Sequence, residues 1–220
     1  MHKAELGALP KVLKIFFDLL YHQFAWTYDL VAWIVSIGQW KDWVAAALPF
    51  LDGGHVLELG HGPGHLQLAA QRKGLNIFGL DLSPQMGRIC RKRLLRQGFS
   101  PALIRGNGML LPFVSNSFTT VTATFPTEYI LLPKTLAQIH RVLAPGGRFV
   151  LVPLAWVTGT GLLYRFAAWL FRVTGQSVPA DHPALAEGFE RLKAAGFEVE
   201  AQTIEMQHSR VLLVLATKPG

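Results

Sequence analysis

Three glycines at alternate positions interrupt an apolar run and could bring the backbone against a bound cofactor. Residues 56–66 read Val-Leu-Glu-Leu-Gly-His-Gly-Pro-Gly-His-Leu. Gly60, Gly62 and Gly64 lack a Cβ atom, so the chain can turn sharply there and lie close to a ligand. Glu58 stands two residues before the first glycine, at the carboxyl end of an expected strand. A strand, a glycine turn and a helix in this order bind an adenosine-bearing cofactor in doubly wound folds.

A second carboxylate ends the next apolar run. Asp81 closes the sequence Ile-Phe-Gly-Leu-Asp, at about the spacing from the glycines at which an acid reaches ribose hydroxyls in such folds. A charged carboxylate that accepts two hydroxyl hydrogen bonds binds ribose well. Asp81 could instead cap the helix that follows, but Ser83 and Pro84 supply that cap better. We therefore expect Asp81 to bind a ribose.

The details of the glycine loop decide between two cofactors. A dinucleotide fingerprint requires a glycine at the sixth position of G-x-G-x-x-G, where this chain has His65. The form acid-x-G-x-G-x-G instead resembles the first motif of the class I S-adenosylmethionine (SAM)-dependent methyltransferases. An acidic loop also suits a cationic sulfonium with a free amino acid head better than it suits a pyrophosphate. A glycine-rich turn without any ligand stays open as the alternative.

The segment after the third expected strand extends this resemblance. Residues 105–113 read Arg-Gly-Asn-Gly-Met-Leu-Leu-Pro-Phe and resemble the Gly-Asp-Ala-x-x-Leu-Pro-Phe of the family. Asn107 replaces the acid that accepts a hydrogen bond from the adenine amine, and its amide oxygen can accept the same bond without charge. The resemblance covers residues 50–153 well and the C-terminal hairpin loosely. It implies a cofactor site made of Glu58, Gly60, Gly62, Gly64, Asp81, Leu82, Met86, Gly106, Asn107, Gly108, Phe125 and Tyr28.

The chain departs from the family pattern at two places. His61 stands where a small residue is common, and its imidazole either touches the carboxylate of the methyl donor or points to solvent. Thr119 follows Phe118 where the family often has an aspartate. Tyr28 and Asp29 resemble the Tyr-Asp of quinone- and phospholipid-type methyltransferases, in which that helix covers the cofactor. Packing of Tyr28 into the core is an equal alternative.

The residues that follow the fourth expected strand argue against several acceptors. Amine methylation of nucleic acid usually uses Asn/Asp-Pro-Pro-Tyr there, where this chain has Phe-Pro-Thr-Glu at 125–128. Cytosine chemistry needs a cysteine at that place, and Cys90 is elsewhere. Catechol-type enzymes need several acids for Mg²⁺, and only Glu128 is present. We expect no metal and leave the catalytic residue unknown, with Glu128, Tyr129 and His22 as weak candidates for a base.

Strands and helices alternate from His55 onward and position these motifs. Strands are predicted near 55–59, 76–81, 101–105, 118–124, 147–153, 197–205 and 210–217, and helices near 64–73, 84–97, 133–143 and 184–195. The pattern predicts an α/β, Rossmann-like doubly wound fold with a mostly parallel seven-stranded sheet. The link near 207–209 is too short for a crossover helix, so the last two strands must form an antiparallel hairpin.

Composition and charge limit where the protein works. The 220 residues suit a single domain, and a single cysteine favours a reducing cytoplasm. No uncharged apolar run is long enough for a membrane-spanning helix. Residues 71–105 hold eight basic side chains and one acidic one, which accounts for the whole net charge of +7. Such a segment could contact phosphate head groups or nucleic acid, but a solvated helix face is favoured because Arg88, Lys92 and Arg96 follow helical spacing.

Two apolar segments could shape the pocket for the methyl acceptor. We expect residues 1–50 to form an aromatic helical cap and residues 154–183 to form an apolar, lid-like insertion. Three interpretations explain these residues. They could form a lid over an apolar pocket, a membrane contact with Arg165 and Arg172 at head-group level, or a homodimer interface.

Together these features predict a SAM-dependent methyltransferase for a small apolar or amphipathic acceptor, such as a lipid or quinone. We expect it to be cytoplasmic, with a peripheral membrane contact and a homodimer left open. An RNA methyltransferase that uses the basic 71–105 face and a SAM-binding protein without turnover are the alternatives. Nucleic acid is disfavoured as a partner.

Overall fold

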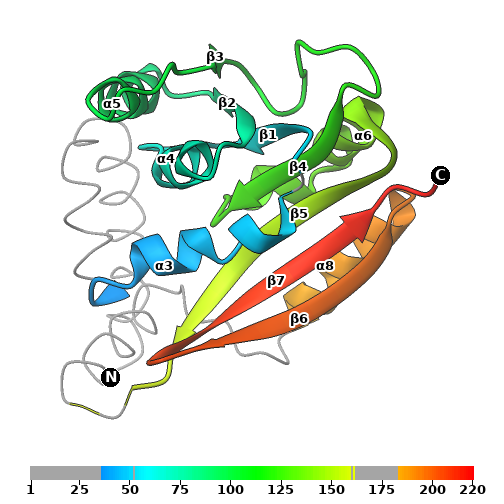
Figure 1. Cartoon of the computed structure of the whole chain (residues 1–220). Coiled ribbons are helices and arrows are strands. Elements are labelled where there is room, and N and C mark those ends of the chain that lie inside the picture. The colour runs from blue at the N-terminus through cyan, green and yellow to red at the C-terminus, as the bar shows by residue number, and fades with distance from the viewer. Residues whose placement is uncertain (1–35, 52, 160, 162–182) are drawn as a thin grey trace, which may run out of the picture.

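The computed structural model describes residues 36–51, 53–159, 161 and 183–220. Within these residues a seven-stranded sheet forms in the order β3-β2-β1-β4-β5-β7-β6 (Figure 1). The strands are β1 (His55–Leu59), β2 (Asn76–Asp81), β3 (Leu103–Arg105), β4 (Phe118–Thr124), β5 (Leu143–Val157), β6 (Glu198–Met206) and β7 (Ser209–Thr217). Neighbouring strands from β3 to β5 are parallel, whereas β7 runs antiparallel to both β5 and β6. The predicted fold class, with its reversed hairpin strand, is confirmed.

Helices cover both faces of this sheet. They are α3 (Trp40–Ala45), α4 (His65–Arg72), α5 (Pro84–Leu95), α6 (Pro133–Val142) and α8 (Pro183–Ala194), with short 3₁₀ turns η2 (Leu48–Phe50) and η3 (Glu128–Leu131). Side chains alternate between faces along a strand. Val56 therefore packs in a core with α3, η2 and α4, and Leu57 packs in a core with α6 and α8. Figure 1 shows α3 in front of the sheet and α8 behind it.

The strand predictions hold best where apolar runs are buried. β1, β2 and β4 have the predicted bounds, and the helices differ from theirs by one or two residues at an end. The third strand is shorter than predicted, since only Leu103–Arg105 pairs with β2. Ser83 caps α5 as predicted, because its Oγ accepts a hydrogen bond from the backbone N of Met86 at 3.3 Å.

The prediction for the fifth strand, residues 147–153, is wrong at both ends. β5 begins at Leu143, four residues before the predicted start, and passes through Pro-Gly-Gly. The reason is pairing with the C-terminal tail: Gly146 N donates to Lys218 O at 3.0 Å, and Lys218 N donates to Gly147 O at 2.9 Å. At the other end the strand continues to Val157, opposite Ser209 of β7.

These bounds also correct the two apolar segments. Residues 154–157 extend β5 and do not start an insertion, while residues 162–182 lie outside the described part of the chain. Of the expected cap, residues 1–35 lie outside it as well. The rest, from Ser36, includes α3, whose Trp43 is buried and donates from Nε1 to Ser209 Oγ at 2.8 Å. This end of the cap is therefore part of the core.

No helix among the described residues has the length and apolar character needed to cross a membrane.

Candidate active site

The glycine loop lies at the carboxyl end of β1 and leads into α4. Gly60, Gly62 and Gly64 have φ of 69°, 51° and 85°, so each adopts a left-handed conformation that other residues rarely take. Gly60 N also donates to the carbonyl of Leu80 at 2.7 Å, which ties the loop to the end of β2. Three left-handed residues at alternate positions explain why the sequence needs glycine at each one.

The three glycines differ in what surrounds them. A Cβ atom on Gly64 would lie 2.3 Å from Sγ of Cys90, so this glycine allows α5 to pack against the loop. Among the described residues, a Cβ on Gly62 would meet nothing closer than the Gly60 carbonyl at 4.0 Å, so these residues leave that side open for a ligand. A Cβ on Gly60 would lie 2.9 Å from the hydroxyl of Tyr129. The loop thus has one packing glycine and two that border the candidate site.

Asp81 connects the loop to β2. Its Oδ2 accepts from Gly62 N at 2.9 Å and its Oδ1 accepts from Ser83 N at 2.8 Å. The side chain is only 5% exposed. Each carboxylate oxygen can accept a further hydrogen bond. Asp81 therefore holds the loop in shape and still has the acceptors that ribose hydroxyls require, so the ribose contact stays a prediction.

Glu58 is buried beneath the loop and faces α4. Its Oε2 accepts from Gln67 Nε2 at 2.8 Å. The pKa of Glu58 is raised to about 8, mainly by burial and to a smaller extent by the charge of Asp81, while the Gln67 hydrogen bond opposes the rise. Glu58 is therefore largely protonated at neutral pH, which its sequence position does not reveal. A nearby ammonium group would favour the ionised form.

His61 points into the protein. It is 4% exposed, and its Nδ1 donates to the carbonyl of Gly62 at 2.7 Å. Burial lowers its pKa, although the negative charge of Asp81 acts in the opposite direction. The alternative in which His61 points to solvent is wrong, because the imidazole packs beside Gly79, whose added Cβ would lie 3.0 Å from its Cδ2.

Further residues of the predicted cofactor site, among them Asn107, which was predicted to bind the adenine amine, lie at the ends of β2 and β3. Leu82 is 64% exposed directly after Asp81, so its side chain is accessible to an aromatic base. Asn107 is also exposed, and its Oδ1 accepts from Met109 N at 2.9 Å, which occupies one of its two acceptor positions. Gly106 N donates to Asp81 O at 3.0 Å and joins this turn to β2. Met86, by contrast, is fully buried in the first turn of α5.

Tyr129 spans two glycine turns of the site. Its hydroxyl is next to Gly60, and its Cε2 would lie 3.0 Å from a Cβ on Gly108. It comes from η3, which follows β4, and it is half-buried. Of the three candidate bases, the structure brings Tyr129 to the loop, leaves Glu128 exposed one residue earlier, and does not describe His22. Tyr28, a candidate cofactor residue, also lies outside the described part.

Trp40, which the sequence did not predict as part of the site, packs against Phe125, which it did. The ring centroid of Trp40 lies 4.7 Å from that of Phe125, a predicted cofactor residue with φ of 49°. Trp40, Glu58, Gly60 and Thr124 are among the residues that line a cavity of about 30 Å³ beside the loop. The signal for Trp40 was the aromatic stretch before residue 43, which does not by itself distinguish core from site.

The described residues fit SAM. The backbone at Gly62 borders open space among the described residues. The acidic side chains of Asp81 and Glu58 lie beside the same loop. Four buried polar side-chain atoms have no hydrogen-bond partner among the described residues, and two of them, Gln67 Oε1 and Thr122 Oγ1, belong to neighbours of Glu58. Thr122 lies beside Glu58 in the sheet. Buried polar groups normally have partners, so these atoms favour a polar ligand or water near the loop.

Comparisons with known proteins agree with this geometry. The chain is similar in fold to several solved structures, including the YcgJ protein from Bacillus subtilis (TM-score 0.59, 17% identity, 81% of this chain and 99% of that one). A phosphoethanolamine N-methyltransferase from Haemonchus contortus, solved with S-adenosylhomocysteine, is also similar (TM-score 0.58, 19% identity, 83% of this chain and 54% of that one). At these identities the likeness shows the fold, which is the Rossmann-like fold of class I methyltransferases.

Sequence comparison is more specific. Residues 57–151 match the family described as "Methyltransferase domain". The demethylmenaquinone methyltransferase of Symbiobacterium thermophilum is 36% identical over 140 residues, 60% of this chain and 56% of that one. That of Thermus thermophilus is 30% identical over 154 residues, 66% of this chain and 70% of that one. The chain therefore belongs to the class I SAM-dependent methyltransferases, in the group that contains these quinone methyltransferases, and the predicted family is confirmed.

Proposed function

We propose that this protein transfers a methyl group from SAM to a carbon of a small apolar acceptor of the quinone type. The observation that carries the proposal is the glycine loop, held open at Gly62 and tied by the buried Asp81 to the end of β2. The support for a quinone acceptor comes from relatives named demethylmenaquinone methyltransferase and ubiquinone/menaquinone biosynthesis C-methyltransferase. Since the chain spans just over half of the Symbiobacterium protein, that support concerns the shared part.

The cofactor would supply an activated methyl group on a positively charged sulfur. The chain's own residues would bind and orient it: Asp81 at the ribose, the backbone of Gly60 and Gly62 at the amino acid head, and Leu82 with Asn107 at the adenine. Binding of the ammonium of SAM near Glu58 would favour its ionised form. Fixing donor and acceptor in line and excluding water provides most of the rate in such a displacement.

Methylation at carbon also needs an electron-rich ring. A base that takes the phenolic proton of a reduced quinone raises the electron density at the ring carbon, which then forms the bond to methyl and loses its own proton. Tyr129 is the candidate base because its hydroxyl borders Gly60. Tyr129→Phe should lower kcat while it leaves the Kd of SAM nearly unchanged. An unchanged kcat would remove Tyr129 from the chemistry.

The proposed function is tested by methyl transfer itself. Purified protein is incubated under reducing conditions with methyl-labelled SAM and a short-chain demethylated quinol, and the product is identified by mass. We expect a single added methyl on the ring carbon, formed by the wild type and by Asp42→Asn, a change of an exposed aspartate on α3. Asp81→Asn should lose most of the activity. Transfer to RNA but not to the quinol would support the RNA methyltransferase instead, and SAM binding without any product would support the protein without turnover.

The remaining expectations about surroundings belong to this proposal. An apolar acceptor suits an apolar cover, which residues 1–35 and 162–182 would supply. An apolar cover on an enzyme in the cytoplasm would also favour contact with a membrane or burial of the apolar surface in a homodimer. Turnover of an apolar quinol that exceeds turnover of a polar analogue with the same ring would support an apolar cover. Equal turnover would argue against it.

A further inference from the structure

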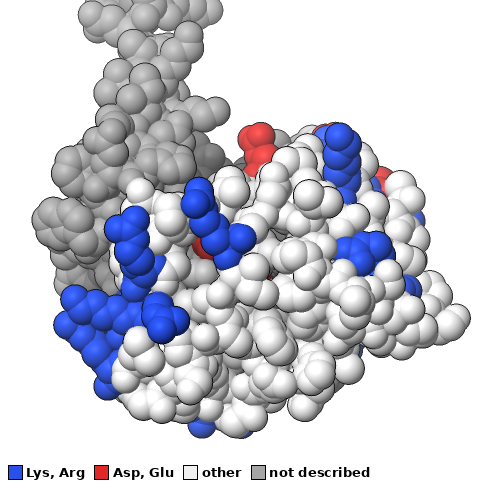
Figure 2. All heavy atoms as spheres, turned by 90° about the horizontal axis from the view of Figure 1, so that it is seen from above, with Lys and Arg blue, Asp and Glu red and all other residues white. Residues whose placement is uncertain are grey.

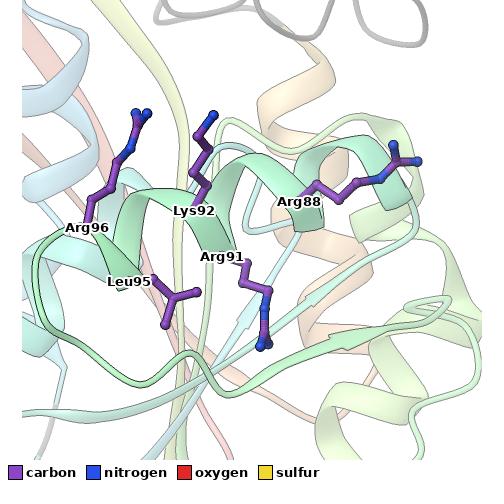
Figure 3. A pocket seen from close by; sticks show the side chains of 5 residues that line it. All are labelled: Arg88, Arg91, Lys92, Leu95 and Arg96. Carbon is purple, nitrogen blue, oxygen red and sulfur yellow. The ribbon is translucent and has the colours of Figure 1, made fainter.

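The exposed side of α5 carries a stripe of cations that has no part in the candidate active site. The stripe is formed by Arg88, Arg91, Lys92 and Arg96 together with Leu95, and these five residues line one open hollow of about 390 Å³ (Figure 3). Their spacing of three or four residues puts them on one side of the helix. The other side of the helix is buried against the domain. Figure 3 shows Leu95 and Arg91 extending together on one flank of the stripe and Lys92 and Arg96 on the other.

Within the described part of the chain, the charges of this stripe take no part in holding the fold together. Elsewhere in the basic segment, Arg93 donates to the carbonyl of Pro63 at 2.7 Å, and Arg105 donates to that of Leu82 at 3.3 Å. The four cations of the stripe, in contrast, make no hydrogen bond or ion pair with any residue that the structure describes. Seen from above, Lys and Arg side chains gather at the edge of the molecule where α5 lies (Figure 2). Unpaired like charges held this close together repel, so an anionic partner would stabilise them.

We infer that the α5 stripe docks this protein on an anionic membrane surface. Each basic side chain near a surface of anionic lipid strengthens binding about 5-fold, and the stripe has four of them. Leu95 is 52% exposed in the middle of the stripe, where it can enter the head-group region between the phosphates. The inference rests partly on the proposed function, because an apolar quinone acceptor would be dissolved in the bilayer.

A membrane fits the stripe better than a nucleic acid does. Nucleic-acid surfaces that ignore sequence combine cations with aromatic side chains that stack on bases. The stripe has no aromatic residue and instead presents a leucine. A leucine gains little from a polyphosphate backbone but gains from an acyl boundary.

The test measures binding to lipid vesicles without any acceptor. Vesicle binding can therefore fail while methyl transfer is observed, and vesicle binding can be observed while methyl transfer fails. Full-length protein is sedimented with vesicles of phosphatidylcholine alone or with about one part in four of phosphatidylglycerol. We expect binding that requires phosphatidylglycerol and weakens with salt. Lys92→Gln with Arg96→Gln should lower the partition coefficient about 25-fold, at about 5-fold for each lost charge. The matched control, Lys134→Gln with Lys193→Gln, removes two exposed charges from α6 and α8 and should change it little.

Leu95→Ala provides a second arm because it keeps every charge. It should weaken vesicle binding by about 5-fold and leave binding to a polyphosphate unchanged. Thermal unfolding of each variant near the wild-type temperature shows that the fold is intact. Equal binding by the stripe variant and its control would overturn the inference. Salt-sensitive binding of RNA without binding to vesicles would also overturn it, and would identify the stripe as a nucleic-acid surface.

Discussion

Alanine at Gly64 should damage the fold, whereas alanine at Gly62 should damage cofactor binding. At Gly64 the left-handed φ of 85° costs a residue with a side chain about 1–2 kcal/mol. The new Cβ would also lie 2.3 Å from Sγ of Cys90, and overpacking of this kind costs about 1–3 kcal/mol. Gly64→Ala should therefore lower the free energy of unfolding by about 2–5 kcal/mol.

Gly62→Ala is the matched control. Its φ of 51° carries the same conformational cost, but the only atom of the described residues within 4.0 Å of the new Cβ is the Gly60 carbonyl oxygen. We expect a loss of stability of only about 1–2 kcal/mol. Because that open side is where SAM would approach, its affinity should fall at least about 10-fold, near 1.4 kcal/mol.

A double-mutant cycle separates the two causes at Gly64. Cys90→Ala removes the sulfur, so the Gly64→Ala, Cys90→Ala double variant should recover the overpacking part of the loss and keep the conformational part. Denaturant unfolding gives the four free energies, and calorimetry with SAM gives the affinities. The reasoning is refuted if Gly64→Ala is as stable as Gly62→Ala, or if the two substitutions at 64 and 90 are additive.

Four further outcomes follow from the site. Asp81→Asn should lower the free energy of unfolding by about 1–3 kcal/mol in denaturant titrations, because the new amide faces a backbone donor; unchanged stability would contradict its role in the loop. Glu58 has a raised pKa of about 8, so the folded state holds more protons than the unfolded state between the usual 4.5 and 8. Stability should fall as pH rises through that range, and Glu58→Gln should flatten the fall in unfolding titrations; an equal slope in both proteins would contradict it. Burial raises the pKa of Cys90 to about 12, so iodoacetamide should label it only as fast as the protein opens, as mass spectrometry can follow; rapid labelling of folded protein would count against this. Asn107→Asp should hold or improve SAM affinity by calorimetry and Asn107→Leu should lower it; equal binding would mean that adenine is held by other groups.

Much of the fold could be predicted because local signals and buried runs agree. The apolar runs of β1, β2 and β4 are long enough to be buried on both faces, which makes their bounds visible in the sequence. Ser83 and Pro84 mark the start of α5 by their own chemistry. The antiparallel pairing of β6 and β7 could be predicted because the link near residues 207–209 is too short for a crossover helix. The glycine loop was predictable as well, since few other sequences need three left-handed residues so close together.

The rest depends on contacts between distant segments. The start of β5 is set by the C-terminal Lys218, which pairs with the Pro-Gly-Gly segment. The role of Gly64 depends on Cys90, and the protonation of Glu58 depends on how deeply α4 buries it. The sequence alone predicts the helix, strand or loop in which each of these residues lies. It does not predict which distant side chain each residue will contact.

Hydrogen–deuterium exchange with and without S-adenosylhomocysteine tests the central claim most directly, because it locates the cofactor without requiring turnover. Bound ligand should slow the exchange of backbone amides at residues 60–64, 81–83 and 106–109, the three turns at the carboxyl ends of β1, β2 and β3. The basic face of α5 and the C-terminal hairpin should exchange as before. Protection that is absent from the glycine loop, or that appears only elsewhere, would contradict the assignment of this site to SAM.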